Sequence, residues 1–169
     1  ILRRNCIVSE ELFNMNFNSI KLLVTNYHNI PEELLDEPIK LEFHDKKIKT
    51  IILQNNNRKI EFFKPHSDIT IIQIITQDEI GNVGCLDYDP DYTYGFKHYK
   101  DVTVFSSGYP YGEKMVTAFG RIISVNDYEF EHDIATEKGS SGSPIILLSN
   151  QKVIGVHKQG NINYNQGKS

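Results

Sequence analysis

The sequence predicts an all-β protein, and two observations support this prediction. Short apolar and β-branched runs recur along the 169 residues, with turn-forming residues between them. Several runs alternate apolar and polar side chains, as Tyr128, Phe130, His132 and Ile134 do, which is the period of a half-buried strand. Many short strands at near-regular spacing favour a barrel or a sandwich.

The individual elements follow from the same pattern. The stretch at 31–38, which reads PEELLDEP, predicts a single helical turn. Residues 77–100 are polar, aromatic and rich in turn formers, and they show no clean alternation. The expected strands, in chain order, cover residues 20–25, 39–43, 47–53, 59–63, 69–75, 102–105, 116–125, 128–134, 144–148 and 153–157.

This distribution predicts two β lobes. A long connection inside a compact domain usually has a role or joins two units. We therefore expect an N-terminal lobe at residues 1–80, a connection at 81–100 and a C-terminal lobe at 101–169.

Composition excludes several classes of protein. The net charge is −4 and no block of Lys and Arg occurs, which argues against a nucleic-acid partner. No apolar run approaches the length of a membrane span, and no targeting segment is visible, so localisation stays open. Cys6 and Cys85 could form one bridge, but we expect two free buried thiols. The acidic stretch at 87–92 lacks the glycine and terminal glutamate of a calcium loop, and we expect neither a metal nor a cofactor.

Three local patterns carry candidate chemistry. His28 follows an apolar strand, and Asp68 directly precedes another. The third pattern, GSSGSP at 139–144, places a serine on a glycine-rich turn before an apolar strand. A nucleophilic serine needs such a turn, because its hydroxyl must be exposed and backbone N–H groups must converge on one point. Each pattern alone is weak, and a flexible Gly/Ser loop is an equally good interpretation of GSSGSP alone.

Together, TNYH at 25–28, SDITII at 67–72 and GSSGSP resemble the chymotrypsin-like serine peptidases, which use the order His, Asp, Ser. Gly-Tyr-Pro at 108–110 and FGRI at 119–122 are similar to the glutamyl endopeptidase branch. The resemblance implies two six-stranded antiparallel β-barrels. The family's usual small-residue strand before the catalytic histidine, of the Gly-Thr-Gly-Phe type, is not visible, and the chain stops at 167–169 before the expected last strand and helix. We therefore expect a fold truncated at both ends.

The resemblance also implies roles for individual residues. Ser141 would be the nucleophile, His28 the general base and Asp68 the group that orients His28, while the amides of Gly139 and Ser141 would form the oxyanion hole. Rival histidines at 44, 66 and 98 are interpreted as solvated loop residues, and Asp45 is a rival acid only if the register is wrong.

Substrate specificity is predicted from Thr136 and His157. In glutamyl endopeptidases, a threonine and a histidine near these places bind the acidic side chain of the substrate. The implied substrate is a polypeptide, cleaved after Glu or Asp. Two alternatives stay open: a catalytically silent interaction or structural module, and a serine peptidase of another specificity. The oligomeric state is not predicted.

Overall fold

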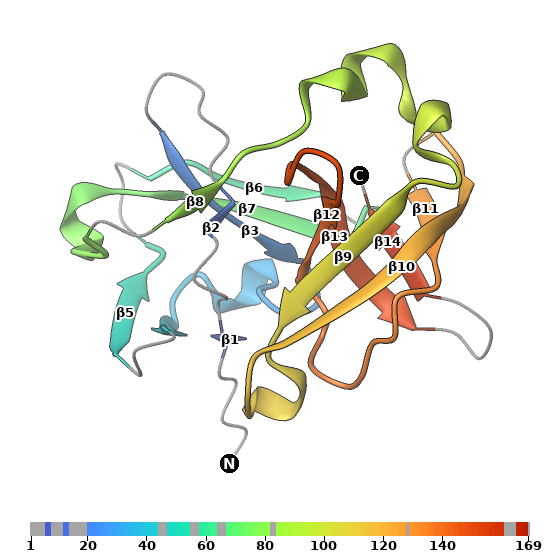
Figure 1. Cartoon of the computed structure of the whole chain (residues 1–169). Helices are drawn as coiled ribbons and strands as arrows, with labels where there is room; N and C mark the ends of the chain where they lie inside the picture. The colour runs from blue at the N-terminus through green and yellow to red at the C-terminus, as the bar shows by residue number, and fades with distance from the viewer. Residues whose placement is uncertain are drawn as a thin grey trace.

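The computed structural model of the chain describes its β-strands and most of their connections (Figure 1). Within the described part, no helix is both long and apolar enough to cross a membrane. The described residues are 6–7, 12–13, 20–43, 47–54, 58–63, 67–81, 84–127, 129–160 and 165–168.

Strands from the first half of the chain form three sheets. β3 (Lys21–Asn26), β7 (Ile69–Ile74) and β6 (Ile60–Phe63) make one sheet in the order β3-β7-β6. The remaining strands are β1 (Cys6–Ile7), β4 (Pro38–Glu42) and β5 (Ile48–Ile52) in a second sheet, and β2 (Leu12–Phe13) with β8 (Cys85–Leu86) in a third.

The core of this half is aliphatic and comes from several of its strands. Each fully buried side chain of this kind contributes about 1.5–3 kcal/mol. One buried ion pair lies at the edge of the core: both Arg58 guanidinium nitrogens bond the Asp78 carboxylate, at 2.9 and 2.5 Å. The core residues are Leu23, Ile30, Ile39, Leu41, Ile51, Leu53 and Ile72.

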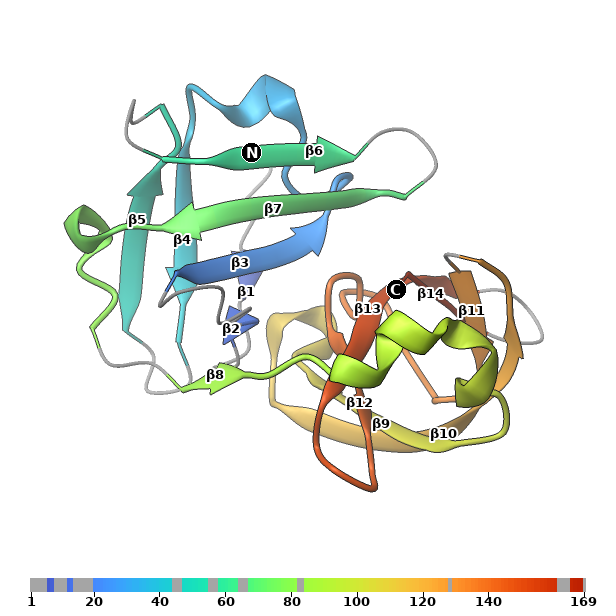
Figure 2. The same cartoon turned by 90° about the horizontal axis from the view of Figure 1, so that it is seen from above.

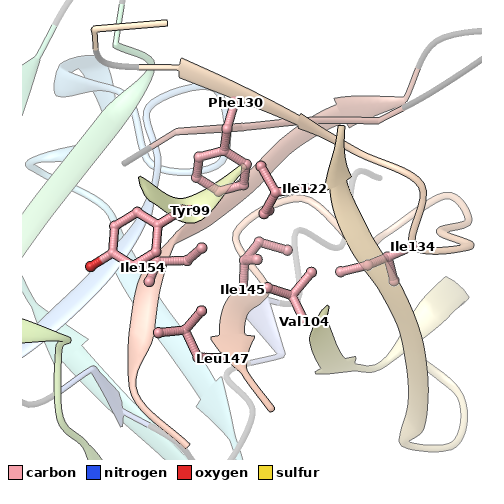
Figure 3. Packing of buried hydrophobic residues seen from close by; sticks show 8 residues of the cluster. All are labelled: Tyr99, Val104, Ile122, Phe130, Ile134, Ile145, Leu147 and Ile154. Atoms are coloured by element: carbon pink, nitrogen blue, oxygen red, sulfur yellow. The ribbon is translucent and has the colours of Figure 1, made fainter. Parts of the chain in front are cut away.

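The second half forms a closed barrel of six strands in the order β10-β11-β14-β13-β12-β9. Its core is a cluster of aliphatic and aromatic side chains (Figure 3). The strands are β9 (Thr103–Gly108), β10 (Val116–Val125), β11 (Glu129–His132), β12 (Pro144–Leu147), β13 (Val153–Gly160) and β14 (Asn165–Lys168). The core residues are Tyr99, Val104, Ile122, Phe130, Ile134, Ile145, Leu147 and Ile154.

The two groups of strands lie side by side, joined by the segment that carries β8 and two short 3₁₀ helices (Figure 2). These helices are η3 (Pro90–Tyr94) and η4 (Phe96–Tyr99). The Tyr99 hydroxyl donates to the buried Asp89 carboxylate at 2.8 Å, which attaches the connection to the barrel core. Three further 3₁₀ helices are η1 (Glu32–Leu34), η2 (Thr76–Asp78) and η5 (Pro110–Gly112).

The predicted all-β fold class is confirmed, and η1 occupies the stretch predicted as a helical turn. The expectation of a missing last strand is wrong. β14 pairs with both β11 and β13 and closes the barrel, because backbone hydrogen bonds need no apolar pattern. Among the described residues, the first half forms three sheets, so one closed barrel is present where the resemblance implied two.

Candidate active site

His28 and Asp68 meet because β3 and β7 pair in antiparallel register. Asn26 lies opposite Ile69, so the chain leaving β3 runs beside the chain entering β7. His28 Nδ1 lies 2.7 Å from Asp68 Oδ2, and the His28 backbone N–H donates to Asp68 Oδ1 at 3.0 Å. The carboxylate therefore holds both the backbone and the ring of the histidine.

Asp68 adopts a left-handed backbone conformation, with φ of 53°. Aspartate is one of the few non-glycine residues that tolerate this region. Its carbonyl oxygen accepts from the Tyr27 N–H at 2.9 Å and from the Asn26 side-chain amide at 3.2 Å. These bonds hold the unusual conformation in place and aim the carboxylate at His28.

Ser141 lies on the turn that leads into β12. The Gly142 N–H donates to the His157 carbonyl at 2.8 Å, and the His157 N–H donates to the Ser143 carbonyl at 2.8 Å. These two bonds fasten the turn to β13. Gly139 and Gly142 have φ of +96° and +88°, where a side chain is disfavoured, so both glycines of the GSSGSP pattern are required by the backbone.

The same turn contacts the first half of the chain beside His28. The Asn29 side-chain amide donates to the Ser141 carbonyl at 3.1 Å. A Cβ on Gly142 would lie 2.8 Å from Thr25 Oγ1, so the backbone of the turn approaches β3 closely. No sequence pattern indicated a role for Asn29, although it directly follows His28.

The Ser141 hydroxyl donates to the Lys158 carbonyl oxygen at 3.3 Å. Among the hydrogen bonds of the described residues, none joins this hydroxyl to the His28 ring. Ser141 is half-buried, whereas the His28 side chain is 48% exposed, so solvent and a ligand can reach the imidazole.

The backbone amides of Gly139 and Ser141 have no hydrogen-bond acceptor within the described part of the chain. The intervening Ser140 N–H donates to the Glu137 carbonyl at 3.1 Å. The Tyr111 N–H donates to the Lys138 carbonyl at 2.8 Å, so the loop after Gly-Tyr-Pro is bonded to the residue that directly precedes Gly139. The two predicted oxyanion donors are thus left free for a ligand.

Thr136 is half-buried on the approach to this turn, and His157 is buried in β13. His157 Nδ1 lies 3.2 Å from Nε2 of His132, which is fully buried in β11. Burial, followed by the charge of His28, lowers the pKa of His157 to about 4. Sequence analysis placed His132 on a strand but assigned it no role.

Among the rival candidates from the sequence, His98 lies within the described residues. His98 is exposed and packs against the Tyr99 ring, with ring centroids 3.8 Å apart. His44, Asp45 and His66 lie outside the described residues, as does the side chain of Cys6. Cys85 is half-buried in β8, and burial raises the pKa of its thiol. No cluster of metal-ligand type occurs among the residues that the structure describes.

An all-β fold that brings a histidine–aspartate pair beside a serine-bearing glycine turn is the arrangement of the chymotrypsin-like peptidases. The family model of the trypsin-like peptidase domain matches residues 6–156. The chain therefore belongs to the trypsin-like peptidase family.

Solved structures support the same fold. The chain is similar to the HtrA-type protease AlgW with decapeptide, at a TM-score of 0.64 and 15% identity over 87% of this chain and 44% of that one. It is also similar to the serine endoprotease from Yersinia pestis, at a TM-score of 0.63 and 15% identity over 86% of this chain and 48% of that one. The chain thus spans less than half the length of these proteins. No curated protein matches. The glutamyl endopeptidase branch stays a prediction.

Proposed function

We propose that this chain is a serine endopeptidase that hydrolyses peptide bonds through an acyl-enzyme on Ser141. The observation that carries the proposal is the 2.7 Å pairing of His28 Nδ1 with Asp68, next to a turn whose Ser141 carbonyl accepts from Asn29. Membership of the trypsin-like peptidase family supports it. The decapeptide in the AlgW structure is in keeping with a polypeptide substrate.

In this mechanism His28 is the general base. Its Nδ1–H donates to Asp68, which leaves Nε2 with a lone pair for the serine proton. Ser141 Oγ bonds to the scissile carbonyl carbon as its proton moves to Nε2, and Asp68 stabilises the resulting imidazolium. The imidazolium then protonates the departing amine as the C–N bond breaks. A water molecule, deprotonated by His28 in the same way, releases the acyl group.

One side-chain movement precedes this chemistry. The Ser141 hydroxyl donates to the Lys158 carbonyl in the free protein. For attack it turns about its Cα–Cβ bond until it donates to His28 Nε2. Catalytic hydrogen bonds commonly form only in the complex with substrate.

The free amides of Gly139 and Ser141 stabilise the oxyanion of the tetrahedral intermediate. Both N–H groups flank the nucleophile and have no competing acceptor within the described residues. Each oxyanion donor lowers the activation barrier of this kind of reaction by about 3 kcal/mol. Gly139 serves because its φ of +96° aims its amide without the strain a side chain would suffer.

We further propose that Thr136 and His157 bind an acidic side chain of the substrate, so that cleavage follows Glu or Asp. Thr136 would donate its hydroxyl proton and His157 a ring N–H to the carboxylate. What supports this is the location of both residues at the nucleophile turn: Thr136 precedes it, and His157 exchanges backbone hydrogen bonds with it.

A catalytically silent module is the second candidate function. The bond from the Ser141 hydroxyl to Lys158, in place of one to His28, favours it.

A fluorophosphonate probe separates the two candidates, because it reacts only with an activated serine. We expect labelling of the wild type, none of Ser141→Ala, and wild-type labelling of Ser149→Ala, which changes an exposed serine. A folded wild-type chain that never labels would establish the silent module.

Peptides that differ only in Glu or Gln before the scissile bond test the specificity. We expect the wild type to prefer Glu, and we expect Thr136→Val to weaken that preference by about tenfold, the effect of one hydrogen bond to a charged group. Equal hydrolysis of both peptides by the wild type would contradict acidic specificity and leave peptidase activity intact.

A further inference from the structure

Two buried histidines form a pair in the interior of the barrel. His132 Nε2 in β11 lies 3.2 Å from His157 Nδ1 in β13, and the two rings meet edge to face at 61°. His132 is 0% exposed and His157 is 3% exposed. β14 lies between the two strands and places Gly167 opposite His157. The pair is therefore joined through the side chains alone.

The two outer ring nitrogens of the pair differ in their surroundings. His132 Nδ1 is buried without any hydrogen-bond partner. His157 Nε2 also has no partner among the described residues, but it is not one of the fully buried atoms without a partner, although the residue as a whole is only 3% exposed. Of the two outer nitrogens, His157 Nε2 is therefore the one that could bond a ligand.

Both rings are neutral at neutral pH. Burial, followed by the charge of His157, lowers the pKa of His132 to about 3, although the Asp133 carboxylate acts in the opposite direction. Burial and the charge of His28 lower the pKa of His157 to about 4. A neutral imidazole has one N–H donor and one acceptor, so only one member of the pair donates in the shared bond.

The buried Nδ1 of His132 decides which ring donates. If His157 donated from Nδ1, the proton of His132 would be on its own Nδ1, as an N–H group sealed from water without an acceptor. If His132 donates from Nε2, its Nδ1 is only an unfilled acceptor. A buried N–H group without an acceptor is rarer than a buried acceptor without a donor, and it costs more free energy. His132 is therefore the donor, and the proton of His157 is on Nε2.

We propose that His132 is a positioning residue for substrate recognition: its Nε2–H donates to His157 Nδ1 and fixes His157 in the tautomer that presents Nε2–H to the substrate carboxylate. This inference rests on the proposed acidic specificity of the same site. Without His132, His157 would also adopt the Nδ1–H tautomer, in which the Nε2 lone pair faces the carboxylate and repels it.

The arrangement also disfavours an imidazolium at His157. A charged His157 would have to donate from Nδ1, which would drive the proton of His132 onto the sealed Nδ1. Acid recognition by this pair therefore uses a neutral N–H and changes little with pH around neutrality. The charges that act on the pair are those of Asp133 and His28, and Lys158, the residue after His157, forms an ion pair with Glu129 at 3.5 Å.

Two variants at one position test the proposal through activity. His132→Leu removes the donor, whereas His132→Gln keeps an amide N–H at a similar reach. For matched Glu and Gln peptides, we expect His132→Leu to lose about tenfold or more of the Glu preference, mainly through KM for the Glu peptide. Hydrolysis of the Gln peptide should change little, and His132→Gln should restore most of the preference.

The outcomes separate this inference from the proposed function. A wild type without Glu preference would refute acidic specificity itself. A wild type with that preference, together with a folded His132→Leu variant that keeps it and its pH profile, would overturn the role of His132 alone.

A second measurement needs no variant and no activity. Nitrogen-15 NMR of the wild-type imidazole rings reports which nitrogen holds the proton. We expect His157 at pH 7 to be neutral and protonated on Nε2, with His132 also protonated on Nε2. A proton on Nδ1 of His157, or a charged His157, would overturn the proposal.

Discussion

The side-chain amide of Asn29 donates to the backbone carbonyl of Ser141 at 3.1 Å, across 112 positions of the chain. Asn29 directly follows His28, so this bond joins the predicted base to the predicted nucleophile through one intervening residue. It crosses between the two groups of strands. The distance between imidazole and hydroxyl therefore depends on a contact outside the predicted triad.

Replacing Asn29 with Leu should slow the reaction without unfolding the chain. The variant keeps the side-chain volume and loses the donor to Ser141, so we expect kcat/KM to fall by about tenfold and the free energy of unfolding to fall by about 1 kcal/mol. Peptide hydrolysis and urea unfolding measure the two quantities. Thr25→Ser keeps the hydroxyl that also accepts from Asn29 and should behave as the wild type. Full activity in Asn29→Leu would show that the contact does not align the site.

A methyl group on Gly142 should push the nucleophile turn away from β3. Its Cβ would lie 2.8 Å from Thr25 Oγ1, at a φ of +88° that costs a side chain about 1–2 kcal/mol. Gly81→Ala is the matched control, because Gly81 has φ of +76° and nothing within 4 Å of its Cβ. Both variants should lose stability in urea unfolding. The rate of fluorophosphonate labelling should fall in Gly142→Ala alone, and equal labelling rates would contradict this account.

Asp68→Asn should abolish most activity and leave the fold intact. Asparagine tolerates the left-handed backbone at this position, but its amide would face His28 Nδ1 and force the proton onto Nε2. In that tautomer His28 cannot accept the serine proton, and we expect kcat to fall by about 10⁴-fold. Asp101→Asn changes an exposed aspartate with φ of 64° and serves as the control. A kcat near wild type in Asp68→Asn would exclude the triad.

The buried histidine pair should make the protein sensitive to acid. The pKa values of His132 and His157 are lowered from 6.5 to about 3 and about 4, so the unfolded chain binds more protons between pH 6.5 and 4. Stability from this pair is complete above pH 6.5 and is lost as the pH falls toward 4. Urea unfolding between pH 7 and 5 measures the slope. His132→Gln should reduce it by up to about 1.4 kcal/mol per pH unit, the linkage of one proton. An unchanged slope would mean that His132 is already charged in the folded state.

Sequence patterns predicted the strands that bury one face. β3, β7 and β10 follow apolar or alternating runs, and each lies within about two residues of its expected limits. β14 escaped prediction because its sequence, NQGK, has no apolar face and its place is set by pairing with two neighbours. The two-residue strands β1, β2 and β8 are too short to show a period.

The residues of the candidate site also fall into those that sequence patterns could select and those that they could not. His28, Asp68 and Ser141 could be selected because each lies at the end of a recognisable strand or on a glycine turn. Asn29 and His132 could not, since their partners are 112 and 25 positions away and depend on tertiary structure. The alternating sequence pattern around a histidine is the same whether its ring packs against a leucine or against a second imidazole.

Asn29 and the backbone of Gly142 hold the turn with Ser141 against β3. In the proposed mechanism, the reactivity of Ser141 therefore depends on how closely the two groups of strands pack against each other. Under the proposed mechanism, a compound that inserted between the turn and β3 would slow acylation of Ser141 without occupying the peptide site. Such a compound would contact Asn29 and Thr25, the two residues that meet the backbone of the turn.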